Sequence, residues 1–327
     1  MLTLDGSTLE GGGQLVRVAL SLSAICNIPV RITNIRANRS AKARRGGGTQ
    51  RQSLGRAHGE QGKKGRGHDA RESLRPGGGL KESHLAAVNW LAEKCSADVD
   101  GAGVGETEVV IRPKRSRKPR PLQSSSEEVE GIALKNPGSV WLIWQVIFPY
   151  IVFNLPESDS RGKIDANAAF RIVLRGGTNV PKSPSSEYVQ QVFIPLCERI
   201  GLPRFEVNVL QRGWAGSAPA IGEVELVVKG GNKGDVDSSV ERQDAFSLPP
   251  FTLTDRGDIT RIEMTIVAGS QETYSMLETQ LPLALLTLGS TGAFPADLPI
   301  TTHPSSTASS GDERRLYVLL VAHTSNG

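Results

Sequence analysis

A glycine-rich loop with one carboxylate, followed by arginines, is the part of this sequence that best fits chemistry on phosphates. Residues 10–14 read Glu-Gly-Gly-Gly-Gln, and Arg17 follows Gln14 by about one helical turn. Glycines let a backbone turn tightly and approach a ligand closely, and the N-terminus of a helix favours an anion. Glu10 could hold a divalent cation against phosphates. The pattern therefore predicts a site for a metal-bound polyphosphate.

The glycine triplet alone is not specific, because it is neither a GxGxxG fingerprint nor a Walker P-loop. An ordinary turn between a strand and a helix, with surface arginines around it, explains the same residues equally well. Two further cations, Arg36 and Arg39, come directly after the next predicted strand. They are the second reason to expect an anion here.

Hydrophobic periodicity indicates the elements that position these residues. A short apolar strand opens the chain, and a helix is predicted over 14–27, with a buried stripe of Leu15, Val18, Ala19, Leu22, Ile25 and Cys26. A strand follows over 30–35, and His84 heads a second helix over 81–95. A later helix over 139–153 is apolar nearly all round. Its lone polar side chain, Gln145, must find a partner or face a cleft.

The order of predicted elements repeats after about 100 residues, as helix, strand, loop, helix, strand, strand. The first unit has helices over 14–27 and 81–95, with strands over 30–35, near 97–99 and over 107–112. The second has helices over 139–153 and 185–200, with strands over 171–174, 205–210 and 223–228. In the second of those helices the predicted buried face is Tyr188, Val192, Leu196 and Ile200. A strand over 259–267, a helix over 272–288 and a strand over 315–322 follow.

The segment 40–76 differs from its surroundings in composition. It holds ten Lys/Arg and three Asp/Glu, a balance of +7, whereas the whole chain has a net charge of +4. It has scarcely any large apolar residue and no period, so it is predicted to be a disordered insertion. A basic, glycine-rich tract could contact RNA phosphates, but a solvated insertion is the favoured interpretation.

The remaining composition is that of an ordinary globular protein, 38% hydrophobic and 22% charged in 327 residues. No apolar run reaches the length of a membrane span, and no signal layout opens the chain. Three cysteines in apolar helix positions indicate reduced, buried thiols. The basic cluster 114–120 favours a nuclear location, with the cytoplasm as a further one, although a solvated loop explains it as well.

The sequence LDGSTLEGGGQLVRVALSLS, followed by IRANRS, resembles the N-terminus of the RNA 3′-terminal phosphate cyclases. The intact loop is similar to the catalytic, eukaryotic-type branch of that family. The resemblance implies an α+β fold of repeated units, each like the C-terminal domain of a translation initiation factor, with a smaller α/β insert domain. It places the first two repeats at 1–250 and part of the insert domain at 251–327, with the third repeat absent.

The same resemblance implies an ATP-dependent ligase-type reaction, in which an RNA 3′-phosphate becomes a 2′,3′-cyclic phosphate through a histidine adenylate. It assigns Glu10 to Mg²⁺ or Mn²⁺, and to ATP the residues Gly11, Gly12, Gly13, Gln14, Arg17, Arg36, Arg39, His84 and Gln145. The adenylated histidine is expected beyond residue 327, so the chain as given is expected to be inactive. His323 is interpreted as a surface turn residue. The alternative is a non-catalytic nucleotide- or RNA-binding relative in ribosome biogenesis.

Overall fold

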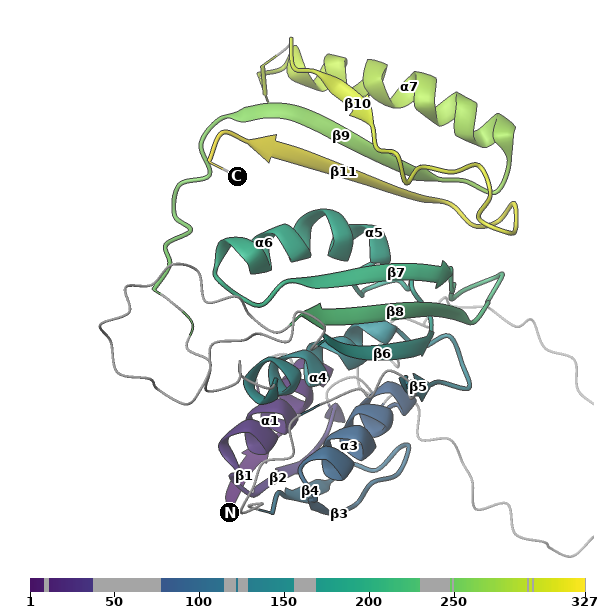
Figure 1. Cartoon of the computed structure of the whole chain (residues 1–327). Helices are drawn as coiled ribbons and strands as arrows, with labels where there is room; N and C mark the ends of the chain where they lie inside the picture. Colours follow the sequence, from purple (N-terminus) through teal and green to yellow (C-terminus); the bar gives the residue numbers. More distant parts are fainter. Residues whose placement is uncertain are drawn as a thin grey trace, which may run out of the picture. The chain divides into compact units, whose positions relative to one another are not determined.

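The computed structural model describes residues 1–8, 12–37, 78–114, 122, 129–155, 169–229, 248, 250–292, 294–295 and 297–326. Glu10, Gly11, Arg39 and the predicted insertion 40–76 lie outside these ranges. The chain divides into two compact units, Met1–Arg115 and Ser116–Gly327. The elements of each unit are labelled in Figure 1.

In its described residues, the first unit is a four-stranded sheet with two helices, α1 (Gly13–Cys26) and α3 (Glu82–Lys94). The strand order is β1 (Leu2–Asp5), β2 (Val30–Thr33), β4 (Val109–Arg112) and β3 (Asp98–Asp100). Strands β1 and β2 are parallel, and the other two pairs are antiparallel. Figure 1 shows both helices on one face of this sheet. Alternate apolar strand residues are buried: Val30, Ile32, Val109 and Ile111.

The second unit contains a sheet with the same topology. Its order is β5 (Glu130–Ala133), β6 (Ala169–Gly176), β8 (Gly222–Lys229) and β7 (Phe205–Gln211). Strands β5 and β6 are parallel and the other pairs antiparallel, as in the first sheet. Helix α4 (Val140–Asn154) occupies the place of α1 in chain order. The predicted repeat of elements is therefore present. Each repeat also begins with a strand, β1 or β5, that the predicted common order of elements did not include.

An aromatic cluster forms the core of the second repeat. The rings of Trp144 and Phe148 on α4 stack at 4.8 Å, and both contact Phe205 on β7, at 5.5 and 4.8 Å. Phe193 completes the cluster at 6.2 Å from Phe205. Ten residues of α4 are buried, which is why its sequence is apolar nearly all round. Among the described residues, the structure has no helix with both the length and the apolar character to cross a membrane.

The predicted buried face of α1 is wrong except at Ala19. Val18 and Leu22 are 45% and 53% exposed. The buried set is Val16, Ala19, Leu20, Ser21, Ser23 and Ala24. Small side chains dominate it, because they let a helix backbone approach its neighbours closely, and a count of large apolar residues overlooks them. Cys26 is also exposed and Cys95 intermediate, so only Cys197 is a buried thiol as predicted.

The helix predicted over 185–200 is broken into three stretches, α5 (Ser186–Tyr188), a π turn η1 (Val189–Phe193) and α6 (Ile194–Arg199). The N–H of Ile194 donates to the carbonyl of Val189, five residues back. A π turn rotates the following residues relative to a regular helix. As a result Val189 and Cys197 are buried, whereas Tyr188 and Leu196 of the predicted face are each 37% exposed.

The rest of the second unit is a three-stranded sheet with one helix. Its order is β10 (Ile300–Thr302), β9 (Ile259–Val267) and β11 (Tyr317–Thr324), and α7 (Gln271–Gly289) joins β9 to the parallel β10. The sequence pattern did not predict β10. The interpretation of His323 as a turn residue is wrong, because it pairs with Arg261 inside β11. Its Nε2 lies 3.1 Å from Oε2 of Glu263 on the neighbouring strand, and this cross-strand contact holds it in the sheet.

Residues on either side of the predicted insertion are held together by hydrogen bonds. The N–H of Gly79 donates to the carbonyl of Ile35 at 2.8 Å, and Nη1 of Arg36 donates to the carbonyl of Gly79 at 3.1 Å. Gly79 has a φ of +74° and a backbone that approaches the carbonyl of Gly105, so glycine is required there. These contacts join the end of β2 to the segment that leads into α3.

Deleting residues 40–76 should leave the first unit folded and more stable. The deletion shortens the connection between Ile35 and Gly79 roughly sixfold. The free-energy cost of closing this loop, which is entropic, falls by about 1.5 kcal/mol as a result. Urea unfolding of the deletion variant and the full chain measures this difference. A less stable variant, or loss of cooperative unfolding, would show that the segment contributes to the fold.

Candidate phosphate-binding site

The chain enters the glycine loop through a turn built by Asp5 and Gly6. The N–H of Gly6 donates to the carbonyl of Thr33, and a Cβ on Gly6 would lie 2.7 Å from that oxygen. The Asp5 carboxylate accepts hydrogen bonds from Ser7 and from Asn34, and these bonds lower the pKa of Asp5. The turn ties the end of β1 to the end of β2 and directs the chain toward the start of α1.

Helix α1 begins at Gly13 with Gly12 as its N-cap, so no side chain caps its first N–H groups. Its first turn holds no acidic residue. The first four N–H groups of a helix lack partners within the helix, and the helix dipole places positive charge there. A 14-residue helix with this start attracts an anion.

His84 and Arg17 both border Gly13. A Cβ on Gly13 would lie 2.6 Å from Nε2 of His84 and 2.8 Å from Nη1 of Arg17. A side chain at this position would displace one of the two groups, which is the local reason for a third glycine. The structure therefore brings together three sequence-predicted residues, Gly13, Arg17 and His84, at the start of α1.

The protonation state of His84 follows from its contacts. Its side chain is 3% exposed, and its Nδ1 accepts a hydrogen bond from the N–H of Lys81 at 3.2 Å. Burial, together with the charges of Arg17, Arg36 and Lys81, lowers the pKa of His84 to about 3. The imidazole is therefore neutral near pH 7. Since Nδ1 is the acceptor, the proton is on Nε2, and Nε2–H is a donor on the side of Gly13.

Arg36 is a second cation of this site and, unlike Arg17, is buried. It is 8% exposed and has a left-handed backbone, with φ at 56°. Its bond to the carbonyl of Gly79 connects the end of β2 to the segment that leads into α3, where His84 lies. This contact fixes the distance between the end of β2 and the segment before α3, although 43 residues separate Arg36 from Gly79 in the chain.

Taken together, this end of the first unit offers backbone N–H groups, a neutral histidine donor and guanidinium groups around one point. The acceptors that suit such a set are the oxygens of a phosphate or polyphosphate. A neutral histidine donates to an anion at little cost, whereas a third positive charge next to Arg17 and Arg36 would be repelled. The geometry supports binding and charge stabilisation of phosphates more directly than it supports proton transfer.

The corresponding position of the second repeat is closed by its own side chains. Helix α4 has Ser139 as its N-cap, and the Ser139 hydroxyl accepts from the N–H of Trp141 and contacts the hydroxyl of Ser183. The indole N–H of Trp141 donates to the carbonyl of Thr178 at 3.1 Å. Among the described residues, the same topology therefore has a cationic helix start without a side-chain cap in the first repeat and a capped one in the second.

The other predicted site residues have different places. Gln14 is exposed on the first turn of α1. Gln145 is exposed on α4, in the second unit, and the predicted metal ligand Glu10 lies outside the described residues together with Gly11 and Arg39. Among the residues that the structure describes, no cluster of three or more His, Cys, Asp or Glu could hold a metal ion.

Sequence reasoning missed Gly79 and Lys81 as members of the site. Gly79 makes the close turn that joins Arg36 to α3, and the backbone N–H of Lys81 fixes the tautomer of His84. A signal for both was present: the glycine triplet 77–79 stands directly before the second helix, as the triplet 11–13 stands before the first.

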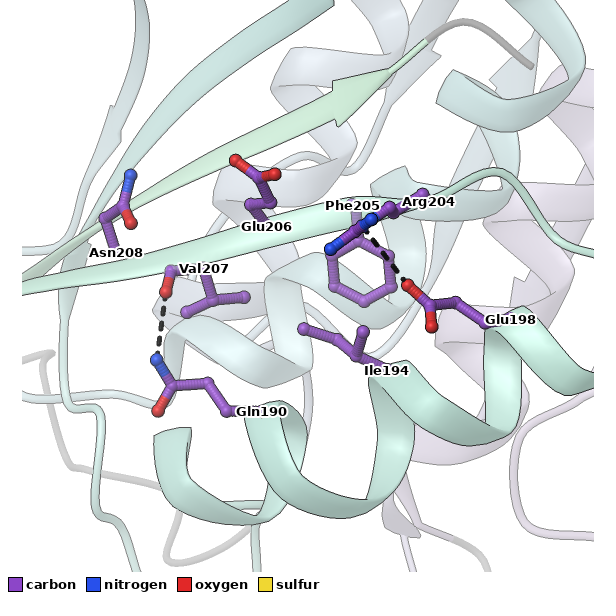
Figure 2. A pocket seen from close by; sticks show the side chains of 8 residues that line it. All are labelled: Gln190, Ile194, Glu198, Arg204, Phe205, Glu206, Val207 and Asn208. Carbon is purple, nitrogen blue, oxygen red and sulfur yellow. Dashed lines mark hydrogen bonds and ion pairs between the residues drawn. The ribbon is translucent and has the colours of Figure 1, made fainter. Parts of the chain in front are cut away.

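A pocket of about 380 Å³ in the second unit does not suit an anion. Figure 2 shows it between strand β7 and the helical stretch η1–α6, with Gln190, Ile194 and Glu198 facing the strand. Its lining carries two carboxylates, Glu198 and Glu206, against one cation, Arg204. The amide of Gln190 donates to the carbonyl of Val207, and Arg204 pairs with Glu198 at 3.4 Å.

The candidate phosphate site of the first unit is consistent with the protein family that the sequence matches. A family model of RNA 3′-terminal phosphate cyclases matches residues 8–55 and 68–288. The chain belongs to the RNA 3′-terminal phosphate cyclase family. The matched region includes the glycine loop, Arg17, Arg36 and His84. The break in the match, from 56 to 67, lies inside the predicted insertion 40–76 and is shorter than it.

Curated relatives carry the same family name. An RNA 3′-terminal phosphate cyclase of Ignicoccus hospitalis is 30% identical over 269 residues, which is 82% of this chain and 54% of the relative. That of Desulfurococcus amylolyticus is 32% identical over 65% of this chain and 43% of the relative. That of Methylococcus capsulatus is 31% identical over 71% of this chain and 50% of the relative. The chain thus spans about half the length of the curated relatives it matches.

The neutral state of His84 in this cyclase-family chain predicts a dependence of stability on pH. The pKa is about 6.5 in the unfolded chain and about 3 in the folded one, so between these values the unfolded chain binds more protons. Stability from this group is complete above pH 6.5 and falls as the pH falls. At pH 5 the loss should be about 2 kcal/mol relative to pH 7.5.

Urea unfolding of the wild type and of His84→Asn at these two pH values measures this loss of stability. Asparagine keeps an acceptor for the N–H of Lys81 but does not titrate. The pH-dependent loss should be smaller in the variant by about the same 2 kcal/mol. Equal losses in the two proteins would mean that His84 is not held neutral.

Proposed function

We propose that the first unit binds the phosphates of ATP in an RNA 3′-terminal phosphate cyclase that converts an RNA 3′-phosphate into a 2′,3′-cyclic phosphate. The observation that carries the proposal is the donor set around Gly13, made of the helix start, Arg17 and neutral His84. Family membership supports the reaction. An open donor set of this kind favours the catalytic branch over a non-catalytic relative in ribosome biogenesis, which has no need of it.

ATP would supply an adenylyl group to the RNA 3′-phosphate with release of pyrophosphate, so that AMP is the leaving group when the 2′-hydroxyl attacks. The residues of this chain contribute binding and charge. The uncapped N–H groups of α1 and the guanidinium of Arg17 hold phosphate oxygens, and Nε2–H of His84 donates to another oxygen. Arg36 adds positive charge from a buried position and keeps the α3 segment in place. Glu10 is the proposed ligand of Mg²⁺ or Mn²⁺.

We also propose a nuclear location, which the basic cluster 114–120 supports.

Arg17→Ala should weaken ATP binding by about 1.5–3 kcal/mol, or roughly 10- to 150-fold, because a charge-assisted hydrogen bond is lost. Isothermal titration of the full chain with ATP and magnesium measures this. The matched control is Arg31→Ala, which removes an exposed arginine of the same unit that pairs with Glu108 at 2.9 Å. ATP affinity equal in Arg17→Ala and Arg31→Ala would exclude this site.

The same titration tests the role of His84 with two isosteric changes, as part of that prediction. His84→Asn keeps the acceptor for Lys81 and loses the donor near Gly13, whereas His84→Gln places an amide donor near the position of Nε2. We expect the asparagine variant to bind ATP about fivefold more weakly than the wild type, as for the loss of one hydrogen bond near 1 kcal/mol. The glutamine variant should stay close to the wild type.

We expect the 327-residue chain to bind ATP without forming a covalent histidine adenylate. A nucleophilic imidazole needs a nitrogen lone pair at the phosphorus, but Nδ1 of His84 accepts from Lys81 and Nε2 carries the proton. Incubation with α-labelled ATP and magnesium or manganese, followed by a search for acid-labile, alkali-stable label on the protein, is the measurement. Label that disappears in His84→Asn would make His84 the nucleophile. Label that persists there would place the nucleophile at another histidine of this chain.

A further inference from the structure

A pocket of about 360 Å³ lies within the second unit, between two loops of the second repeat and the chain that enters β11. The loops are 179–185, after β6, and 214–218, between β7 and β8, and the entering chain is 314–317. The volume falls in the range of small-ligand sites, roughly 300–1,000 Å³.

The lining of this pocket is cationic. Its described residues include Lys182, Arg314 and Arg315, and no carboxylate is among them. Two described carboxylates lie nearby, and each is paired with an arginine. Asp312 pairs with Arg314 at 2.8 Å, and this contact holds the pKa of Asp312 well below its usual range, whereas Glu187, which accepts from Asn179, pairs with Arg212 at 3.1 Å. Even with these pairs counted as neutral, two positive charges remain at the pocket. A ligand with a negative charge is therefore favoured over a neutral or cationic one.

The two arginines are held in place by backbone carbonyls of the facing loop. Nε of Arg315 donates to the carbonyl of Ala218 at 3.0 Å, and Nη1 of Arg314 donates to the carbonyl of Ser217 at 3.3 Å. The hydroxyl of Ser185 donates to the hydroxyl of Tyr317 at 2.7 Å and ties the other loop to β11. Donors fixed in this way need little reordering when a ligand binds.

Trp214 is the second observation that points to a ligand. It lines the pocket with 6% of its surface exposed, and its indole N–H has no hydrogen-bond partner among the described residues. A buried N–H without an acceptor is costly, and a phosphate oxygen in the pocket would supply that acceptor. The cationic lining and the unsatisfied indole N–H therefore both favour a ligand with negatively charged oxygen atoms.

We propose that this pocket binds a phosphodiester group of single-stranded RNA, at a nucleotide upstream of the reacting 3′ end. The inference rests on the proposed function, because an RNA with a 3′-phosphate carries further phosphodiesters along its strand. Lys182 and Arg315 provide the charge, and the indole N–H of Trp214 provides a further donor. A second contact of this kind would select polynucleotide ends over mononucleotides.

The test measures RNA binding by the full chain without ATP, with a short labelled oligouridylate that ends in a 3′-phosphate. Lys182→Ala should weaken binding about fivefold at low salt and reduce the slope of log K against log salt by about 0.7, as for one phosphate contact on a single strand. The matched control is Lys229→Ala, an exposed lysine of the same unit that pairs with Glu206. It should leave both quantities unchanged.

Trp214→Phe gives an independent readout, because phenylalanine keeps most of the packing and removes the N–H. Wild-type tryptophan fluorescence should change when the oligouridylate binds, and this change should be lost in the variant. Equal RNA affinity of Lys182→Ala and Lys229→Ala would overturn the proposal. So would full competition by AMP or inorganic phosphate at the affinity of the RNA, since the pocket would then hold a free phosphate group.

Titration with ATP separates this inference from the proposed function. Lys182→Ala should bind ATP as the wild type does, because Lys182 and the Gly13 site belong to different units of the chain. RNA binding that is lost in Arg17→Ala but retained in Lys182→Ala would overturn the RNA pocket and leave the ATP site in place.

Discussion

The hydrogen bond from the N–H of Lys81 to Nδ1 of His84 is the contact on which the proposed phosphate site depends. It fixes the imidazole at the N-terminus of α3 with Nε2–H beside Gly13, at the N-terminus of α1. Two helix starts therefore meet around one side chain, and their dipoles add to the charges of Arg17 and Arg36. In that potential a buried imidazole stays neutral. The close approach leaves no room for a Cβ at Gly13, so the glycine and the histidine are required by each other.

The two repeats show how one topology carries different chemistry. Both sheets have the same strand order and directions, and each needs only apolar strand and helix faces to fold. The difference lies at a helix N-cap. In the first repeat Gly12 leaves the helix start to a ligand, whereas in the second Ser139 caps it and Trp141 bonds to the Thr178 carbonyl. The chemistry of a repeat is thus set by its loops, and its fold by its periodic apolar residues.

The sequence predicted the order of elements well, because long helices and alternating strands have clear periods. Of the predicted site residues, the structure places Gly12, Gly13, Arg17, Arg36 and His84 at one end of the first unit, and their role in binding stays a prediction. The sequence pattern missed β5 and β10, since each of these short strands carries a single large apolar residue, Ile132 and Ile300. It misplaced the buried face of α1, because serine and alanine fill it, and that of the helix over 185–200, because a π turn shifts the phase. The tautomer of His84 depends on a backbone contact that no side-chain pattern contains.

The cationic residues of the proposed phosphate site lower the stability of the protein when no ligand is bound. Arg17, Arg36 and Lys81 all act on His84 with the same sign, and each lowers its pKa, so they also repel one another. Burial of Arg36 in a left-handed backbone conformation adds to this cost. The apolar residues of α1, α3 and the sheet must therefore supply enough stability to hold a cationic site in place. A bound polyphosphate reverses the sign of this electrostatic contribution, because its oxygens neutralise the charges and accept from donors already oriented toward them. Ligand affinity and the instability of the free site thus arise from the same residues.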